Sequence, residues 1–115
     1  MKKSLILVII FASIALGSCD LMTTYSITVK NESGNGILMN ITKSTSTPSP
    51  FIPIANHANL VFTDLGGGNG INYYLHVKSS SDSFYRRIDM IVNQNETWTI
   101  IWNAAETRYE VLIGP

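Results

Sequence analysis

The side chains that could carry out chemistry in this sequence are few and widely spaced. Its two histidines, His57 and His76, lie nineteen residues apart, and no carboxylate stands next to either of them in the chain. A metal site usually needs three or four clustered ligands, and a nucleophilic site needs a serine or threonine held beside a base. Serines are plentiful, but none has the spacing of a nucleophile elbow. We therefore expect no catalytic residue, no metal site and no enzyme activity.

A run of glycines, Gly66-Gly67-Gly68-Asn69-Gly70, is the most unusual local feature of the chain. A phosphate-binding loop needs a Lys-Ser/Thr pair after the glycines at a helix start, or a Gly-x-Gly-x-x-Gly motif that opens a helix. Neither is present, and the alternating residues that follow indicate a strand. Because glycine tolerates positive φ angles, we interpret the run as a connection between two strands. A ligand-contacting loop is the alternative.

Aromatic and charged side chains suggest one binding surface. In extended chain, alternate residues share a face, so Tyr74 lies beside His76 and Tyr85 beside Arg87. Tyrosine and arginine are enriched at interface anchors. The candidate surface for a glycan or protein partner therefore comprises Tyr74, His76, Tyr85 and Arg87. The alternative is an ordinary solvent-facing strand in which Arg87 pairs with Asp89.

Composition excludes several classes of protein. The 115 residues include 8 Lys+Arg and 8 Asp+Glu, so the chain lacks the basic excess with which nucleic-acid binders displace phosphate counterions. A hydrophobic fraction of 45% is too high for a disordered chain. The length allows one domain. The single cysteine excludes an intramolecular disulfide and a zinc site built from paired cysteines.

The N-terminus has the layout of a secretory signal. Lys2 and Lys3 form a short cationic segment, and an apolar run of twelve residues follows from Leu5 to Leu16. Twelve helical residues span about 18 Å, well short of the roughly 30 Å hydrocarbon core of a membrane. A signal peptide is therefore favoured over a transmembrane helix. The run ends in Leu16-Gly17-Ser18-Cys19.

These residues resemble the precursor of a bacterial lipoprotein. The lipobox of that class is an aliphatic residue, two small residues and a cysteine, and Leu16-Gly17-Ser18-Cys19 matches it. The resemblance implies cleavage between Ser18 and Cys19, diacylglycerol on the Cys19 sulfur and an acyl chain on its new amino group. Each methylene of an acyl chain that is buried in the bilayer contributes about 0.8 kcal/mol to the free energy of membrane binding, so two or more chains hold a protein on a bilayer. No other cofactor is expected.

The same resemblance implies a location. The protein would be anchored by lipid in the bacterial cell membrane or the outer membrane, with its domain periplasmic or exposed on the surface. Asp20 matches the signal that retains lipoproteins in the inner membrane of enteric bacteria, whereas other bacteria sort differently. The sequence therefore does not distinguish between the two membranes.

The rest of the chain predicts an all-β domain. Apolar and polar residues alternate in seven short runs, and no stretch has sustained helical spacing. The runs are 25–30, 37–42, 60–63, 71–78, 87–92, 97–102 and 109–113. The segment 51–54 contains Pro53, which has no backbone N–H, and is therefore an edge strand or no strand. Trp98 and Trp102 share the apolar face of their run and are expected in the core.

Short strands separated by turn signals every 8–12 residues are typical of a small antiparallel β-sandwich, immunoglobulin-like in the loose sense, or of a barrel. The expected organisation is a signal peptide at 1–18, a lipidated N-terminus and tether at 19–24, and one β-sandwich domain at 25–115. Turns of Ser, Asn and Gly connect the strands.

The function favoured by these observations is a non-catalytic β-sandwich that serves as a binding or interaction module at the envelope. Its expected partners are membrane lipid through Cys19 and an unknown envelope protein or glycan, and no nucleic acid. The alternative is a periplasmic inhibitor or accessory subunit that inserts the glycine run or the Pro48-Ser49-Pro50 loop into a partner. A small hydrolase whose site forms around His57 or His76 only in the folded chain is less favoured.

Overall fold

The computed structural model describes residues 23–66 and 71–115, which form eight strands and no helix. The strands are β1 (Tyr25–Asn31), β2 (Ile37–Thr42), β3 (Ile52–Ile54), β4 (Asn59–Leu65), β5 (Ile71–Ser79), β6 (Tyr85–Val92), β7 (Glu96–Asn103) and β8 (Arg108–Gly114). The all-β prediction is confirmed. In this part of the chain no helix is available that would cross a membrane.

Some of the sequence predictions concern residues outside the described part. The signal peptide, the lipobox and Cys19 lie before it, and residues 67–70 of the glycine run fall between its two segments. Gly66 is described, with a φ of 89° that favours glycine, and its amide donates a hydrogen bond of 2.7 Å to the Tyr73 hydroxyl. Because β4 ends at Leu65 and β5 begins at Ile71, the run does connect two strands, as expected.

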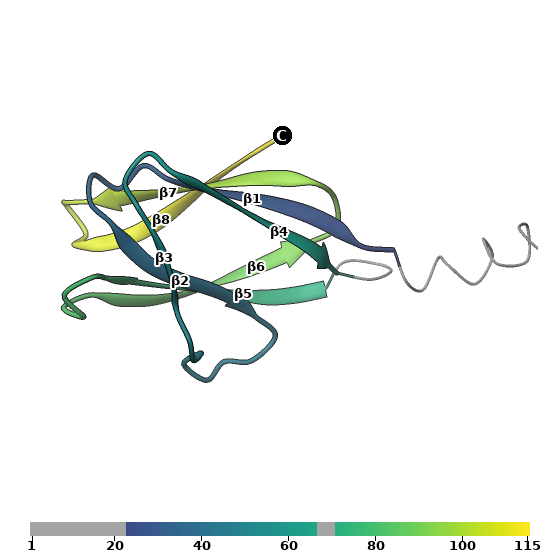
Figure 1. Ribbon diagram of the computed structural model, residues 1–115, viewed down its shortest axis with the longest axis horizontal. Helices are drawn as coiled ribbons and strands as arrows, with labels where there is room; N and C mark the ends of the chain where they lie inside the picture. The colour runs from purple at the N-terminus through teal and green to yellow at the C-terminus, as the bar shows by residue number, and fades with distance from the viewer. Residues whose placement is uncertain (1–22, 67–70) are drawn as a thin grey trace, which may run out of the picture.

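The strands form two four-stranded sheets that pack face to face as a sandwich, not a barrel (Figure 1). The strand order is β4-β1-β7-β8 in sheet A and β3-β2-β5-β6 in sheet B. Neighbouring strands are antiparallel, as predicted, with one exception. β1 and β7 run parallel, with Val29 opposite Trp98. This pairing joins segments that are far apart in sequence, and no hairpin could have made it.

The alternating apolar side chains fill the space between the sheets. Those with no exposed surface are Ile27, Val29, Met39, Leu75, Val77, Val92, Trp98 and Ile100. Trp98 therefore lies in the core, as predicted, and its indole Nε1 donates a hydrogen bond of 2.9 Å to Glu96 Oε1. A buried indole needs such an acceptor because its N–H would otherwise lose its partner on leaving water.

The proline-containing segment is an edge strand. β3 pairs with β2 alone, and Pro53 lies opposite Leu38. A proline has no N–H to leave unpaired on the open side of a sheet. The edge-strand interpretation of residues 51–54 is therefore confirmed for Ile52–Ile54.

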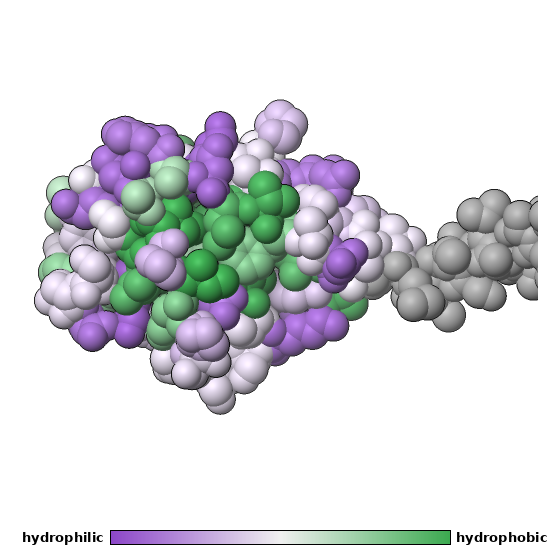
Figure 2. All heavy atoms as spheres, in the orientation of Figure 1, coloured by the Kyte–Doolittle hydropathy of each residue, from purple (hydrophilic) through white to green (hydrophobic). Residues whose placement is uncertain are grey.

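The sandwich is not sealed on either side, because its facing edge strands belong to different sheets. On the side of β3 and β4, the inward-facing residues Ile52, Leu60 and Phe62 are only half-buried. Figure 2 shows hydrophobic residues gathered in the middle of the face in view, bordered by hydrophilic ones. On the side of β6 and β8, the inward-facing Ile88 and Val111 are half-buried and Ile113 is exposed.

The two ends of the sandwich carry different connections. β1 begins at Tyr25 at one end and reaches Asn31 at the other (Figure 1). Leu65 lies opposite Tyr25, so the chain enters the glycine run at the end where β1 begins. The β1–β2, β5–β6 and β7–β8 turns lie at the opposite end, where they surround the site described next.

Candidate functional site

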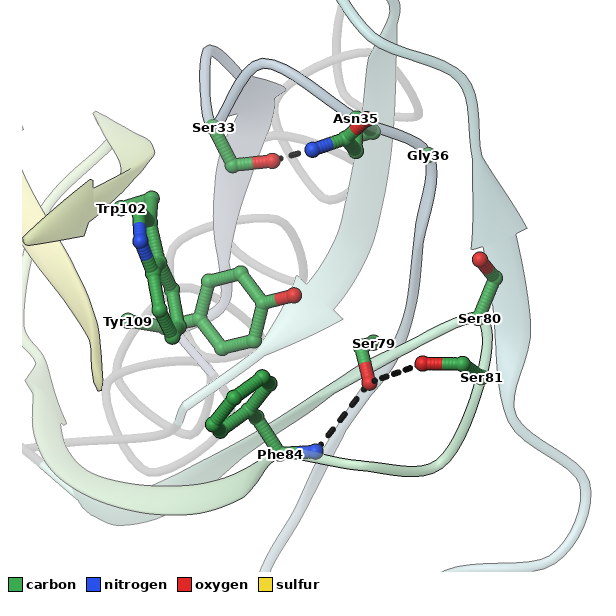
Figure 3. A pocket seen from close by; sticks show the side chains of 9 residues that line it. All are labelled: Ser33, Asn35, Gly36, Ser79, Ser80, Ser81, Phe84, Trp102 and Tyr109. Carbon is green, nitrogen blue, oxygen red and sulfur yellow. Dashed lines mark hydrogen bonds between the residues drawn. The ribbon is translucent and has the colours of Figure 1, made fainter. Parts of the chain in front are cut away.

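A cleft of about 410 Å³ opens at the end of the sandwich where the three turns meet (Figure 3). Ligand sites in proteins commonly have volumes of this order. Three aromatic side chains, Phe84, Trp102 and Tyr109, form one wall. The remaining lining is small and polar, and comes from Ser33, Asn35, Gly36, Ser79, Ser80 and Ser81.

The aromatic wall is a packed cluster. Trp102 in β7 lies opposite Tyr109 in β8, with ring centroids 4.9 Å apart and planes at 69°. Phe84 also packs against Trp102, with ring centroids 5.0 Å apart and planes at 59°. Such inclined pairs add about 0.5–1.5 kcal/mol beyond the burial of the rings. Tyr109 is almost fully buried, whereas Phe84 is 42% exposed and presents its ring to solvent.

The β1–β2 turn, which carries Ser33 and Asn35, is held by the buried side chain of Asn31. Its amide nitrogen donates to the carbonyls of Asn35 (2.8 Å) and Ile54 (3.0 Å). Its amide oxygen accepts from the backbone N–H of Ser33 (3.0 Å) and from the Ser33 hydroxyl (2.6 Å). Gly34 has a φ of 98°, a conformation that other residues rarely adopt. This wall of the cleft is therefore a fixed turn.

The β5–β6 turn positions Phe84 at the mouth of the cleft. The Ser79 hydroxyl oxygen accepts from the backbone N–H groups of Ser83 (2.9 Å) and Phe84 (3.1 Å), the second of which is drawn in Figure 3. Lys78 and Asp82 bridge the same turn through an ion pair of 2.6 Å. Ser79 thus acts as a turn-forming acceptor.

The β7–β8 side of the cleft is held by hydrogen bonds of charged side chains. Arg86 Nη1 donates to the backbone carbonyl of Tyr109 at 2.6 Å. Glu110 accepts from the Asn103 amide at 2.7 Å and from Arg108 Nη2 at 3.0 Å. The hydrogen bond from Asn103, followed by that from Arg108, lowers the pKa of Glu110. These charged groups are engaged with one another beside the cleft and do not line it.

Several polar groups face the cleft. The Tyr109 hydroxyl points into it (Figure 3), makes no hydrogen bond to any residue that the structure describes, and is therefore accessible to solvent there. Asn35 and Ser80, on the facing turns, are exposed and present polar side chains at the cleft. Burial raises the pKa of Tyr109, so its phenol remains an O–H near neutral pH. The cleft can therefore offer donors and acceptors to a ligand.

The surface predicted from the sequence lies elsewhere, on the outer face of sheet B. The fold brings its residues together: His76 lies opposite Arg87, and the Tyr85 hydroxyl is 2.7 Å from His76 Nδ1. The Arg87 guanidinium lies 5.2 Å from the centroid of the Tyr74 ring. Tyr85 is exposed and Tyr74 is half-buried.

The expectation that His76 lies on a solvent-facing strand surface is wrong, because this side chain has no exposed area. The loop between β2 and β3 returns across the sheet and covers it. Nε2 donates to the Ser44 carbonyl at 3.1 Å, so in the neutral ring Nδ1 accepts from Tyr85. From the same loop, the Thr45 carbonyl accepts a hydrogen bond of 3.4 Å from Arg87 Nη1. Burial is the main reason why the pKa of His76 is lowered. The hydrogen bond to Ser44 raises this pKa in part, and the positive charge of Arg87 lowers it further.

The other residues considered for chemistry remain apart from the cleft. His57 sits in the β3–β4 turn, with Nδ1 2.8 Å from Glu32 Oε2 in a solvent-exposed pair. Neither His57 nor His76 lines the cleft. Among residues 23–66 and 71–115, no three His, Cys, Asp or Glu side chains lie close enough to hold a metal ion.

Sequence reasoning missed the cleft. It assigned Trp102 to the core with Trp98, whereas Trp102 is half-buried at the end of β7 and forms a wall of the cleft. The available signal was that Phe84, Trp102 and Tyr109 each stand beside a predicted turn. The pattern could not predict that these three turns lie at the same end of the molecule.

Comparison with known proteins adds no assignment, since no protein-family model and no curated protein matches this sequence.

Proposed function

We propose that the chain is a lipid-anchored bacterial envelope protein whose β-sandwich is a non-catalytic binding module, with the end cleft as its binding site. The observation that carries the proposal is the cleft itself, which combines accessible aromatic rings with polar side chains (Figure 3). Concave sites with an apolar wall and a few convergent polar groups are the usual form of a ligand site.

The position of the cleft fits an anchored protein. The proposed anchor, Cys19, precedes β1, and β1 begins at the end of the sandwich opposite the cleft (Figure 1). A protein tethered through Cys19 would therefore turn the cleft away from the bilayer. That is the orientation in which a partner outside the membrane can reach it.

The side chains that line the cleft support binding more than catalysis. Acid–base or nucleophilic chemistry needs a base within hydrogen-bond reach of the reacting group. No histidine or carboxylate lines the cleft, and Ser79 accepts two backbone hydrogen bonds. Its serines thus serve as hydrogen-bonding groups without an activating partner.

The anchor is tested by labelling with radioactive palmitate in a bacterial host, followed by membrane fractionation. The native chain should be labelled and recovered with membranes. Cys19→Ala should lose the label and accumulate as a heavier, unprocessed precursor, whereas Ser13→Ala, in the middle of the apolar run, should behave as the native chain does. A Cys19→Ala protein of mature mass in the membrane fraction would refute the lipoprotein assignment.

The binding site is tested by comparing the two candidate surfaces. Vesicles that carry the protein through its anchor are incubated with isolated cell envelopes, and vesicle capture beyond that of protein-free vesicles is quantified for the native chain, Trp102→Ala and Tyr74→Ala. Trp102→Ala removes a wall of the cleft, and Tyr74→Ala removes a half-buried aromatic residue from the surface predicted by sequence. Loss of binding in Trp102→Ala alone supports the cleft. Loss of binding in Tyr74→Ala alone would place the binding site on the outer face of sheet B.

A further inference from the structure

The cleft carries no charge. None of its nine lining residues is ionised at neutral pH, and Lys78, Arg86 and Arg108 on neighbouring elements already have partners. Arg86 donates to the Tyr109 carbonyl, Arg108 pairs with Glu110, and Lys78 pairs with Asp82. Phosphate, carboxylate and ammonium groups are bound most strongly by charge-assisted hydrogen bonds, and no ionised side chain lines the cleft to form one with such a ligand.

The aromatic wall suits a ligand with an apolar face. Phe84 and Trp102 are inclined at 59° and offer ring surface at the mouth of the cleft. The face of an aromatic ring is electron-rich and attracts positively polarised edges. The C–H groups on one face of a pyranose ring have this polarity, and their burial against aromatic carbon also removes apolar surface from water.

The polar wall suits a ligand rich in hydroxyl groups. The Tyr109 hydroxyl and the Asn35 amide can each donate and accept. Ser80 adds a hydroxyl on the opposite side, and it is unpaired among the described residues (Figure 3). A sugar places donors and acceptors around the rim of a ring whose face is apolar, so it matches both walls at once.

From this combination we infer that the end cleft binds a neutral carbohydrate, as a monosaccharide unit within a short or longer glycan. The inference rests on the proposed function and names the ligand class of that site. A purely apolar peptide side chain would fill the aromatic wall but leave the Tyr109 hydroxyl and the Asn35 amide unpaired. An anionic glycan would bring charge to a cleft without a cation.

The experiment presents the purified full chain with immobilised oligosaccharides. The panel contains neutral glucose, galactose, mannose and N-acetylglucosamine oligomers beside sialylated, sulfated and uronic acid oligomers. The best neutral binder is then titrated by calorimetry against four proteins: native, Phe84→Ala, Tyr109→Phe and Tyr74→Ala. Phe84 is exposed, and Tyr109→Phe keeps its ring, so both cleft variants should fold.

We expect neutral glycans to bind and charged ones of similar size not to bind. Phe84→Ala should weaken affinity at least about tenfold through loss of stacking surface. Tyr109→Phe should weaken it about fivefold to tenfold through loss of one hydrogen bond. Tyr74→Ala, on the outer face of sheet B, should bind as the native chain does.

Three outcomes would overturn the inference: preference for charged glycans, neutral-glycan binding unchanged in both cleft variants, or no glycan binding at all. The envelope-binding assay separates these outcomes from failure of the proposed function. If envelopes are bound through Trp102 and no neutral glycan is, the cleft is a binding site for another ligand class. If Trp102→Ala leaves envelope binding intact, the proposed function fails as well.

Discussion

Trp98 and Trp102 lie four residues apart on the same face of β7, yet their environments differ. Trp98 is enclosed by both sheets and satisfies its N–H through Glu96, whereas Trp102 lies where the sandwich ends and its ring lines the cleft. The difference lies in what surrounds each ring and not in the strand pattern. At the scale of the residue, position along the strand decides whether an aromatic side chain stabilises the core or is available for binding.

The pairing of Trp98 with Glu96 makes a prediction about stability. In Glu96→Leu the buried indole N–H loses its acceptor, and an unsatisfied buried donor costs about 1–3 kcal/mol. Glu96→Gln keeps an acceptor oxygen in the same place, so its free energy of unfolding should decrease clearly less than that of Glu96→Leu. Urea unfolding followed by tryptophan fluorescence measures both. Equal losses in the two variants would show that the hydrogen bond is not what Glu96 contributes.

His76 makes a prediction about pH. Its pKa in the folded chain lies below the ordinary value of 6.5, so the unfolded chain takes up a proton first as the pH falls. The stability that comes from the neutral buried ring is therefore complete well above pH 6.5 and is lost progressively below it. The free energy of unfolding should fall between pH 7.5 and 5.5.

The matched comparison for this prediction is His76→Gln, which cannot titrate. It retains His57 and every carboxylate, so the difference between the two pH profiles isolates His76. The profile of His76→Gln should be flatter over the same range. Parallel profiles would contradict a lowered pKa at this position.

At the scale of the element, the turns determine the geometry of the cleft. Each of the three turns is held by a short polar side chain: Asn31 for β1–β2, Ser79 for β5–β6 and Asn103 for β7–β8. Such side chains replace the backbone hydrogen bonds that a reversing chain cannot make. These three side chains therefore fix the turns that carry the serines and the asparagine of the cleft wall.

The β1–β2 turn gives the clearest test of this role. Asn31→Ala removes four hydrogen bonds and leaves the carbonyl of Ile54 without its buried donor, so we expect a loss of about 2 kcal/mol. Amide hydrogen exchange at Ser33 and Asn35 should also accelerate. Asn56→Ala removes a single exposed bond to Gly34 and should cost less than about 1 kcal/mol. A comparable loss in the two variants would mean that burial of Asn31 adds nothing.

At the scale of the whole molecule, the sandwich separates its two ends. β7 has eight residues, which at about 3.3 Å per residue places the cleft about 26 Å from the end where β1 begins. The expected tether of residues 19–24 is short, reaching roughly 20 Å when fully extended. An anchored protein of this shape should therefore hold the cleft as the part most distant from the bilayer.

Energy transfer to labelled lipid tests this orientation. A fluorophore on Gln94→Cys, in the β6–β7 turn at the end where β1 begins, should transfer efficiently to an acceptor lipid when the protein is reconstituted into vesicles. A fluorophore on Ser80→Cys, at the cleft, should transfer much less. Equal efficiencies would mean that the domain has no preferred orientation on the membrane.

The local pattern of the sequence was sufficient for much of the fold. Two-residue alternation predicted the strands and their inward faces, and the missing N–H of Pro53 predicted an edge. These features were accessible because each depends on neighbouring residues alone. The same pattern placed His76 on the outer face of its strand but could not predict its burial, since alternation separates the two faces of a strand and does not say what covers the outer one.

The sequence by itself therefore determined the all-β class and most strand positions, and it contains the linear motif on which the proposed anchor rests. Only the tertiary structure decided that β1 and β7 are parallel neighbours, that a loop buries His76, and that three turns enclose one cleft. The reason is physical. Each of these outcomes depends on contacts between residues distant in the chain, such as Asn31 with Ile54 and Arg86 with Tyr109. Those contacts form only when both sheets pack around a common core.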